Sequence, residues 1–181
     1  MYNKITTKRR PGMKKTLLAL AVAWLLLQIG CSTKSSANFE LYLTDAPAYN
    51  IQHVYVTIDA IYLRSEDRQT WTDNILSEPK TIDLIPLRGR EERLAALELP
   101  PGTYSGLKLV ISRVEIVTSE RTFTIAMNPP LTITIPCQFT ITEETSVKVT
   151  LDFDAERSLL WNGMNYNFAP FIIVKNIVHG R

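Results

Sequence analysis

Apolar and polar residues alternate with a period of two along most of the chain after residue 38. In residues 131–141, for example, Leu, Ile, Cys and Phe occupy every second position, with Thr, Pro and Gln between them. This period places the apolar side chains on one face of an extended strand, whereas a helix would need a period of 3.6. The same pattern recurs between turn signals. We therefore predict an all-β fold, a single antiparallel β-sandwich over residues 39–181.

The alternation shifts phase by one residue inside two long segments. The apolar positions are even-numbered up to Ile58 and odd-numbered from Ile61 onward. One extra residue in a strand produces a β-bulge, so we predict bulges near Asp59–Ala60 and, from a similar slip, near Ser112–Arg113. Strands bent in this way often pass from one sheet to the other at the corner of a sandwich.

Turn residues punctuate the segments. Residues 99–104 read LPPGTY, which predicts a tight turn before a long strand, with Tyr104 available to pack beneath it. Such Pro-Gly-x-Tyr entries resemble those of transthyretin-like and related sandwiches, so an immunoglobulin-like or transthyretin-like fold is expected. Asn162–Gly163 predicts a hairpin turn. Pro136 cannot donate to a strand ladder and predicts an edge or a break.

Three further segments carry structural predictions. Phe171–Val174 is apolar on both faces, which predicts a central strand. Cys137 falls in the apolar register, so we expect it to pack in the core, although a lone exported thiol can also pair between molecules. Arg90–Leu97 (REERLAAL) is rich in helix formers and predicts one short helical turn that covers an open end of the sandwich.

Residues 1–30 are predicted to be a signal peptide. A basic run that includes Lys14 and Lys15 precedes an apolar stretch from Leu17 to Leu27, which is 11 residues long. A membrane-spanning helix needs about 20 apolar residues, so a cleaved export signal fits better. Met13 is an alternative start of translation, because Met-Lys-Lys is a typical beginning for a signal peptide.

The end of the apolar stretch resembles a bacterial lipoprotein signal. Gly30 precedes Cys31 directly, although Gln28 stands where Leu is most common. The resemblance implies that Cys31 becomes the N-terminus and carries fatty acyl chains such as palmitate, with residues 31–38 as a flexible lipidated tether. Ser32, rather than Asp, favours the outer membrane in a Gram-negative cell, on its periplasmic or surface face. An ordinary cleaved signal with a coincidental Cys is the alternative.

The charge distribution excludes one class of partner. The chain has a formal charge of +2, but residues 1–30 hold six of the 20 basic residues and no acidic ones. The remaining chain has 14 basic and 18 acidic residues, a net charge of −4. Nucleic-acid-binding proteins need a basic face, so we expect no nucleic-acid partner.

Four carboxylates at strand ends are the candidate metal ligands. Asp152 and Asp154 lie on the same face of one predicted strand, Glu156 follows, and Asp45 ends another strand. If these strand ends meet, their oxygens could hold Ca²⁺, which takes six to eight oxygen ligands. Turn and ion-pair roles are the alternative, with Lys148 and Arg157 close in sequence. No metal or other cofactor is assigned.

No catalytic motif is present. The two histidines are far apart in sequence, and the chain lacks the nucleophile, phosphate-binding and zinc patterns of known enzymes. We therefore predict that the protein is not an enzyme. A carboxylate-based hydrolase is the alternative, and it requires Asp45, Asp152 or Glu156 to converge in a concave pocket.

Two tryptophans are the candidate ligand-binding residues. Trp71 follows a polar loop, and Trp161 precedes the Asn162–Gly163 turn. An aromatic ring near a loop tip can stack on a sugar or insert into a partner, but it can equally close the end of the core. A solvent-exposed, coplanar pair of rings would favour a glycan-binding module.

Several motifs taken together resemble one protein family. They are LTDAP at residues 43–47, the strand with Val54, Val56 and Ile58, Trp71, LPPGTY at 99–104, LDFDA at 151–155, Ser158 and Pro170. The set is similar to domain of unknown function 4382, over residues 38–178. The resemblance implies an exported, lipid-anchored β-sandwich and transfers no catalytic residues. We therefore expect a lipid-anchored cell-envelope protein that binds an envelope protein or a glycan.

Overall fold

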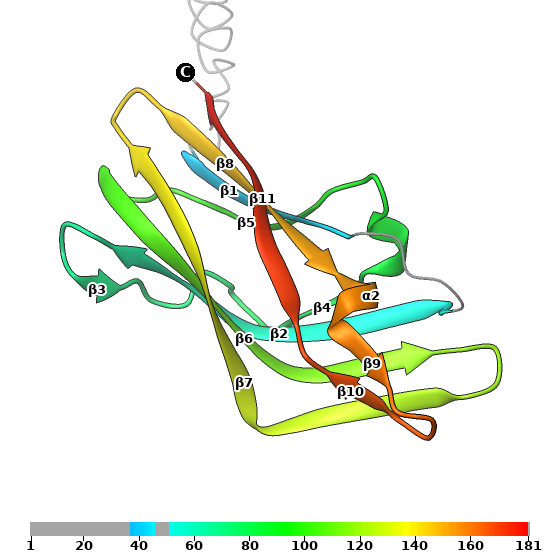
Figure 1. The fold of residues 1–181 in the computed structure, drawn as a ribbon. Helices are drawn as coiled ribbons and strands as arrows, with labels where there is room; N and C mark the ends of the chain where they lie inside the picture. The colour runs from blue at the N-terminus through cyan, green and yellow to red at the C-terminus, as the bar shows by residue number, and fades with distance from the viewer. Residues whose placement is uncertain (1–36, 46–50, 181) are drawn as a thin grey trace, which may run out of the picture. The chain divides into compact units, whose positions relative to one another are not determined.

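The computed structural model describes residues 37–45 and 51–180. The chain divides into two compact units, Met1–Ser35 and Ser36–Arg181, and every described residue belongs to the second. That unit is built almost entirely of strands, in two packed sheets with a small hairpin beside them (Figure 1). The predicted all-β fold is confirmed. No helix among the described residues is long and apolar enough to cross a membrane.

The first sheet has four strands. In spatial order they are β11 (Phe171–Gly180), β8 (Ser146–Asp154), β1 (Phe39–Thr44) and β5 (Glu92–Leu97). β8 pairs in parallel with β1, with Phe39 beside Val147 and Thr44 beside Asp152. The prediction of a purely antiparallel sandwich is therefore wrong at this pair. The alternation of apolar residues is the same in both directions, so it does not encode the direction of pairing.

The second sheet contains the longest strands. They are β2 (His53–Ser65), β3 (Thr70–Trp71), β4 (Lys80–Asp83), β6 (Gly102–Val117) and β7 (Thr122–Ile141). The spatial order is β3-β2-β6-β7, and β4 pairs with β2. The register shifts between Ile58 and Ala60 in β2 and between Ile111 and Arg113 in β6. These irregularities confirm the two predicted bulges.

Four short elements complete the described fold. A 3₁₀ turn, η1 (Ile85–Leu87), follows β4, and a one-turn helix, α2 (Ala155–Ser158), follows β8. β9 (Leu159–Trp161) and β10 (Tyr166–Phe168) form a hairpin at the lower end of the view in Figure 1. Gly163 has a φ of 94° in its turn, which confirms the hairpin predicted from Asn162–Gly163.

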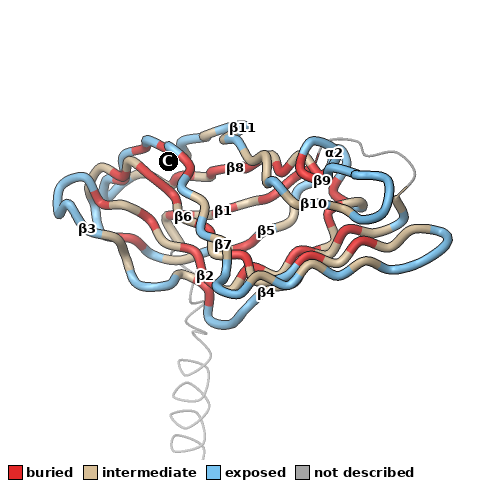
Figure 2. The backbone as a smooth tube through the Cα atoms, turned by 60° about the horizontal axis from the view of Figure 1, so that its bottom comes forward, coloured by how far each residue is buried: buried red, intermediate tan, exposed pale blue. Residues whose placement is uncertain are grey.

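The core lies between the two sheets. Figure 2 shows buried positions alternating with more exposed ones along the strands of both layers. Phe39 from the first sheet stacks on Phe139 from the second, with ring centroids 5.2 Å apart. Cys137 is buried in the same core, which confirms its predicted packing role. Pro136 is exposed on β7, a strand at the edge of its sheet, as predicted.

The turn before β6 is held by Tyr104. Its ring is buried and stacks on Phe139 at 5.2 Å, and its hydroxyl donates a hydrogen bond to the carbonyl of Pro100 at 3.0 Å. A tyrosine that bonds the backbone four residues upstream matches the tyrosine corner of immunoglobulin-type sandwiches. The predicted packing of Tyr104 beneath the Pro-Gly turn is confirmed.

The predicted helical turn at Arg90–Leu97 is wrong, because most of this segment forms β5. β5 pairs antiparallel with β1, and Leu94 faces the core. A segment this short gains little stability from helix propensity, whereas hydrogen bonds to β1 and the burial of Leu94 stabilise the extended conformation. The single short helix of the described residues is α2, at Ala155–Ser158.

The prediction that Phe171–Val174 is a central strand is also wrong. β11 lies at the edge of its sheet and pairs with β8. Ile172 and Val174 pack against the core, whereas Ile173 stays 46% exposed on the outer face. The apolar run therefore includes residues that this fold leaves in contact with solvent. An apolar run alone does not distinguish a central strand from an edge strand.

Candidate functional site

Asp45 lies at the end of β1 and is almost completely buried. Its Oδ1 accepts a hydrogen bond from the backbone N–H of Ala155 at 2.9 Å, while its buried Oδ2 has no hydrogen-bond partner among the residues that the structure describes. Within the same described residues, Asp152 of β8 also has a buried carboxylate oxygen without a partner. The parallel β1–β8 register brings these two strand ends together, as the sequence suggested.

Burial raises the pKa of Asp45 to about 6. The hydrogen bond from Ala155 and the charge of Arg88 lower this pKa, whereas the carboxylates of Asp154 and Asp152 raise it. Burial is the largest of these effects, because a charge in a low-dielectric environment loses its hydration. Near pH 5, Asp45 is therefore mostly protonated, whereas an ordinary aspartate is mostly ionised.

The other predicted calcium ligands have structural roles. Asp154 caps α2, with its Oδ1 accepting from the N–H of Arg157 at 2.8 Å, and Glu156 lies in the first turn of that helix. The ion pair expected between Asp152 and Lys148 is not formed, because Lys148 pairs with Glu91. Among the residues that the structure describes, no three Asp, Glu, His or Cys side chains lie close enough together to hold a metal ion.

Trp71 is partly buried. The ammonium group of Lys108 lies 4.0 Å from the centroid of its ring, a cation–π contact that covers one face. The ring edge packs beside Gly106, where a Cβ atom would lie 3.6 Å from Cη2 of Trp71. Trp71 therefore lies over the outer face of the second sheet beside Lys108, and it is not among the residues that form or adjoin the core.

Trp161 is the exposed tryptophan of the pair. It is 50% exposed at the end of β9, next to Leu160 at 54% and Met164 at 71%. Its ring meets Phe123 of β7 edge-on at 5.6 Å and lies tilted by 54° to Tyr166 of β10. We call Leu160, Trp161, Met164, Phe123 and Tyr166 the hairpin surface. Its rings are not coplanar, so Trp161 and these neighbours do not form the coplanar pair that would favour a glycan-binding module.

Two grooves adjoin the hairpin surface. One has a volume of about 560 Å³ and is lined by residues 121–126 together with Asn165 and Tyr166. The other, of about 500 Å³, is mainly apolar and is lined by Ile125, Met127, Pro129, Pro130, Leu131, Thr132 and Phe168. Ile125 of β7 contributes to both grooves. Arg121 closes one end, with its guanidinium 4.3 Å from the ring centroid of Phe123.

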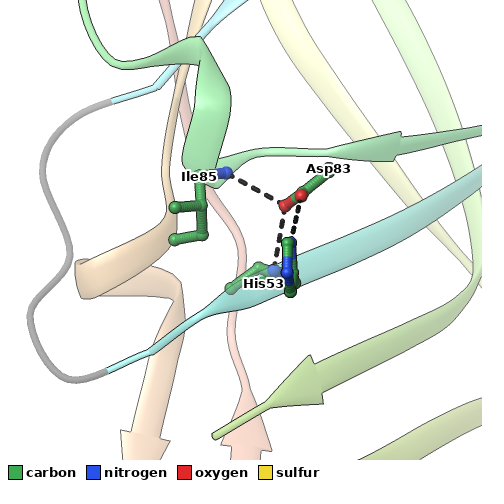
Figure 3. Close-up of polar contacts among 4 residues, drawn as sticks. His53, Asp83 and Ile85 are labelled. Carbon is green, nitrogen blue, oxygen red and sulfur yellow. Dashed lines mark hydrogen bonds and ion pairs between the residues drawn. The ribbon is translucent and has the colours of Figure 1, made fainter.

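The sequence did not reveal a histidine–aspartate pair on the outer face of the second sheet. Nδ1 of His53 lies 2.6 Å from Oδ2 of Asp83, and Oδ1 of Asp83 accepts from the N–H groups of Val54 and Ile85 (Figure 3). The imidazole stacks on Tyr55 at 5.4 Å. Asp83 thus fixes the orientation of a ring that is nearly half exposed. The two residues are thirty positions apart and meet only through β2–β4 pairing.

The pair has the geometry of the base and the orienting carboxylate of a catalytic triad. Within residues 37–45 and 51–180, however, no hydroxyl or thiol makes a hydrogen bond to the imidazole in addition to this contact. The four strand-end carboxylates also line neither of the two grooves. We therefore assign no catalytic residues. Cys31, the predicted lipidation site, lies outside the described residues.

Several of the motif residues found in the sequence hold turns together, although Leu99, Pro100 and Pro101 also line a groove of about 510 Å³. Asp45 binds the N–H of Ala155, and Tyr104 binds the carbonyl of Pro100. Ser158 is fully buried, and its hydroxyl accepts from the N–H of Phe171 at 2.8 Å. These hydrogen bonds stabilise the fold and indicate no catalytic or binding role for the residues that make them.

Comparison with known proteins agrees with this result. Neither the curated proteins nor the solved structures give a match to the chain. Residues 36–170 match the family described as Domain of unknown function (DUF4382), which is three quarters of the chain and confirms the resemblance drawn from the motifs. The chain is a member of the DUF4382 family.

Proposed function

We propose that this protein is a lipid-anchored component of the bacterial cell envelope that binds another envelope macromolecule through the hairpin surface. The observation that carries the proposal is the cluster of exposed large apolar side chains in the hairpin, Leu160, Trp161 and Met164. Exposed apolar side chains gathered beside grooves favour an interaction site. Aromatic residues and methionine are also enriched where proteins bind partners.

The position of the hairpin supports the same proposal. Asn38, which leads out of the tether, accepts a hydrogen bond from Val147 at the start of β8. The hairpin follows α2 at the opposite end of β8. Nine residues of strand separate these ends, a length of about 30 Å. A chain anchored through Cys31 would therefore carry the hairpin surface at the end of the domain away from its anchor point.

The experiment is photo-crosslinking in intact cells. A photoreactive residue at position 164 should give a discrete adduct, and the adduct should be at least tenfold weaker when Trp161→Ala is added, because the neighbouring ring supplies contact area. A photoreactive residue at Val178, which is also exposed and apolar but lies on β11, is the matched control. Equal adducts at both positions, insensitive to Trp161→Ala, would refute the proposal.

A glycan is the second candidate ligand. Trp161 is half exposed beside the 560 Å³ groove, whose lining includes Thr122, Thr124 and Asn165 as hydroxyl and amide groups. An aromatic face with a few polar groups is the chemistry that holds a sugar. In a Trp71→Phe background, the fluorescence of Trp161 should change on titration with chitotetraose or maltotetraose. An unchanged spectrum at millimolar sugar, together with a discrete protein adduct, would favour the protein partner.

A further inference from the structure

The first segment of β7 is an open sheet edge. β7 is the last strand of its sheet, and Thr122–Ala126 pairs with β6 on one side (Figure 1). In the part of the chain that the structure describes, no strand pairs with the other side of this segment. The outward N–H and C=O groups of such a strand are a template for another strand.

This edge lacks the features that protect the other edges of the domain. The later part of β7 carries Pro129, Pro130 and Pro136, which cannot donate to an incoming strand. β11 carries Lys175 and an irregular register between Val174 and Asn176. β5 begins with Glu92 and Arg93. By contrast, residues 122–127 (TFTIAM) contain no charge and no proline, and four of the six favour strands.

The 560 Å³ groove runs along this edge. Six consecutive residues of the chain, Arg121–Ala126, line it together with Asn165 and Tyr166. Side chains alternate between the two faces of a strand, so a groove lined by consecutive residues follows the edge of the backbone. Its shape and its hydrogen-bonding groups therefore suit an extended strand.

The sequence of the edge is complementary to itself. In an antiparallel pair about a twofold axis at Thr124, the threonine of one copy faces that of the other. Phe123 then faces Ile125 of the second copy, Thr122 faces Ala126, and Arg121 faces Met127. No like charges meet, and Thr–Thr and aromatic–β-branched pairs are favourable across strands. Opposed residues have equal parity, so each side chain stays on its own face of the extended sheet.

We propose that two copies of this protein associate by antiparallel pairing of Thr122–Met127, which continues the second sheet from one copy into the other. The pairing is isologous, so it closes as a dimer. This inference does not rest on a partner of the hairpin surface, but the strand of a second copy would fill the 560 Å³ groove and would compete with a glycan there. The dimer would place two hairpin surfaces beside one another, and a partner with repeated sites would then be bound with higher avidity.

Disulfide trapping tests the proposal in the full-length protein in membranes. The Cα atoms of directly opposed residues in antiparallel strands lie about 4.5–5.5 Å apart, within the range that a disulfide spans. Thr124→Cys should therefore give a dimer on mild oxidation. Thr134→Cys, exposed on the same face of β7 but in the proline-containing half, is the matched control and should stay monomeric. Cys137 is buried and should contribute no background.

A charge-swap experiment makes the test independent of the cysteine. Thr124→Lys or Thr124→Glu alone should shift the purified protein to monomer in sedimentation, because like charges face one another across the axis. Mixing the two variants should restore a dimer. The proposal is overturned if Thr124→Cys cross-links no better than Thr134→Cys, if it cross-links to another protein instead, or if mixing restores nothing.

Discussion

At the scale of single residues, Asp45 shows how burial changes a carboxyl group. Its side chain lies at the junction of β1, α2 and the end of β8, where one carboxylate oxygen is hydrogen-bonded and the other has no partner in the described part of the chain. The folded protein raises the pKa of Asp45 from 3.8 to about 6, mainly through burial. A raised pKa means that the folded state binds the proton more tightly than the unfolded state does.

The stability of the fold should therefore depend on pH through Asp45. The protonated form contributes its full stability below pH 3.8, and this contribution is lost as pH rises through about 6. We expect the free energy of unfolding of the wild type, relative to Asp45→Asn, to fall by about 3 kcal/mol between pH 3.5 and pH 7. Denaturant titrations of both proteins at the two pH values measure this. A difference that is constant with pH would contradict the prediction.

Cys137 gives a second prediction at this scale. Burial raises the pKa of its thiol to about 11, so the reactive thiolate is scarce at pH 8 and is also shielded from solvent. In a Cys31→Ser variant, a thiol reagent should modify Cys137 only as fast as the protein unfolds, whereas urea should make the reaction immediate. Rapid modification of the folded protein would show that the thiol is accessible.

At the scale of elements, the turns carry the family's motifs. The helix α2 is too short to be stable alone, and it is held by its Asp154 cap and by the buried hydroxyl of Ser158, which binds the N–H of Phe171. Asp45 binds the same helix from β1. These contacts connect the end of β8 to the β9–β10 hairpin and to the start of β11. They therefore determine the position of the hairpin relative to the two sheets.

The tyrosine corner can be tested by a single-atom change. Tyr104→Phe removes the hydroxyl that bonds Pro100 but keeps the ring that stacks on Phe139. We expect a loss of about 1 kcal/mol in the free energy of unfolding, the usual worth of one such hydrogen bond. Tyr104→Leu, which also removes the stacked ring, should cost clearly more. Equal stability of Tyr104→Phe and the wild type would show that the bond does not hold the turn.

At the scale of the whole molecule, the proposed lipid anchor would decide where the domain works. The proposal predicts that Cys31 carries the acyl chains, which bind membranes in proportion to the methylene groups they bury. Cys31→Ser should move the protein from the membrane fraction to the soluble fraction without changing the fold, because the strands begin at Phe39. Intact mass of the membrane-bound protein gives the independent check. A mature N-terminus without acyl chains, or one that does not begin at Cys31, would refute the anchor.

The period of two, the phase shifts and the turn residues are local signals, and they determined the long strands, both bulges and the turns at Tyr104 and Gly163, but not β5. The sequence by itself also placed Cys137 in the core. Pairing is not local, so the tertiary structure alone decided that β1 and β8 run parallel and that β11 lies at an edge.

The candidate site was likewise predicted in part from the sequence and decided in part by the tertiary structure. The turn at Asn162–Gly163 identified Trp161 as a candidate. The rings that Trp161 contacts, Phe123 and Tyr166, belong to β7 and β10, which come together only in the folded protein. His53 and Asp83 likewise meet through β2–β4 pairing. The sequence of a strand determines which of its side chains share a face. The neighbouring strands determine what those side chains contact, and burial and hydrogen bonding bring these neighbours from distant parts of the chain.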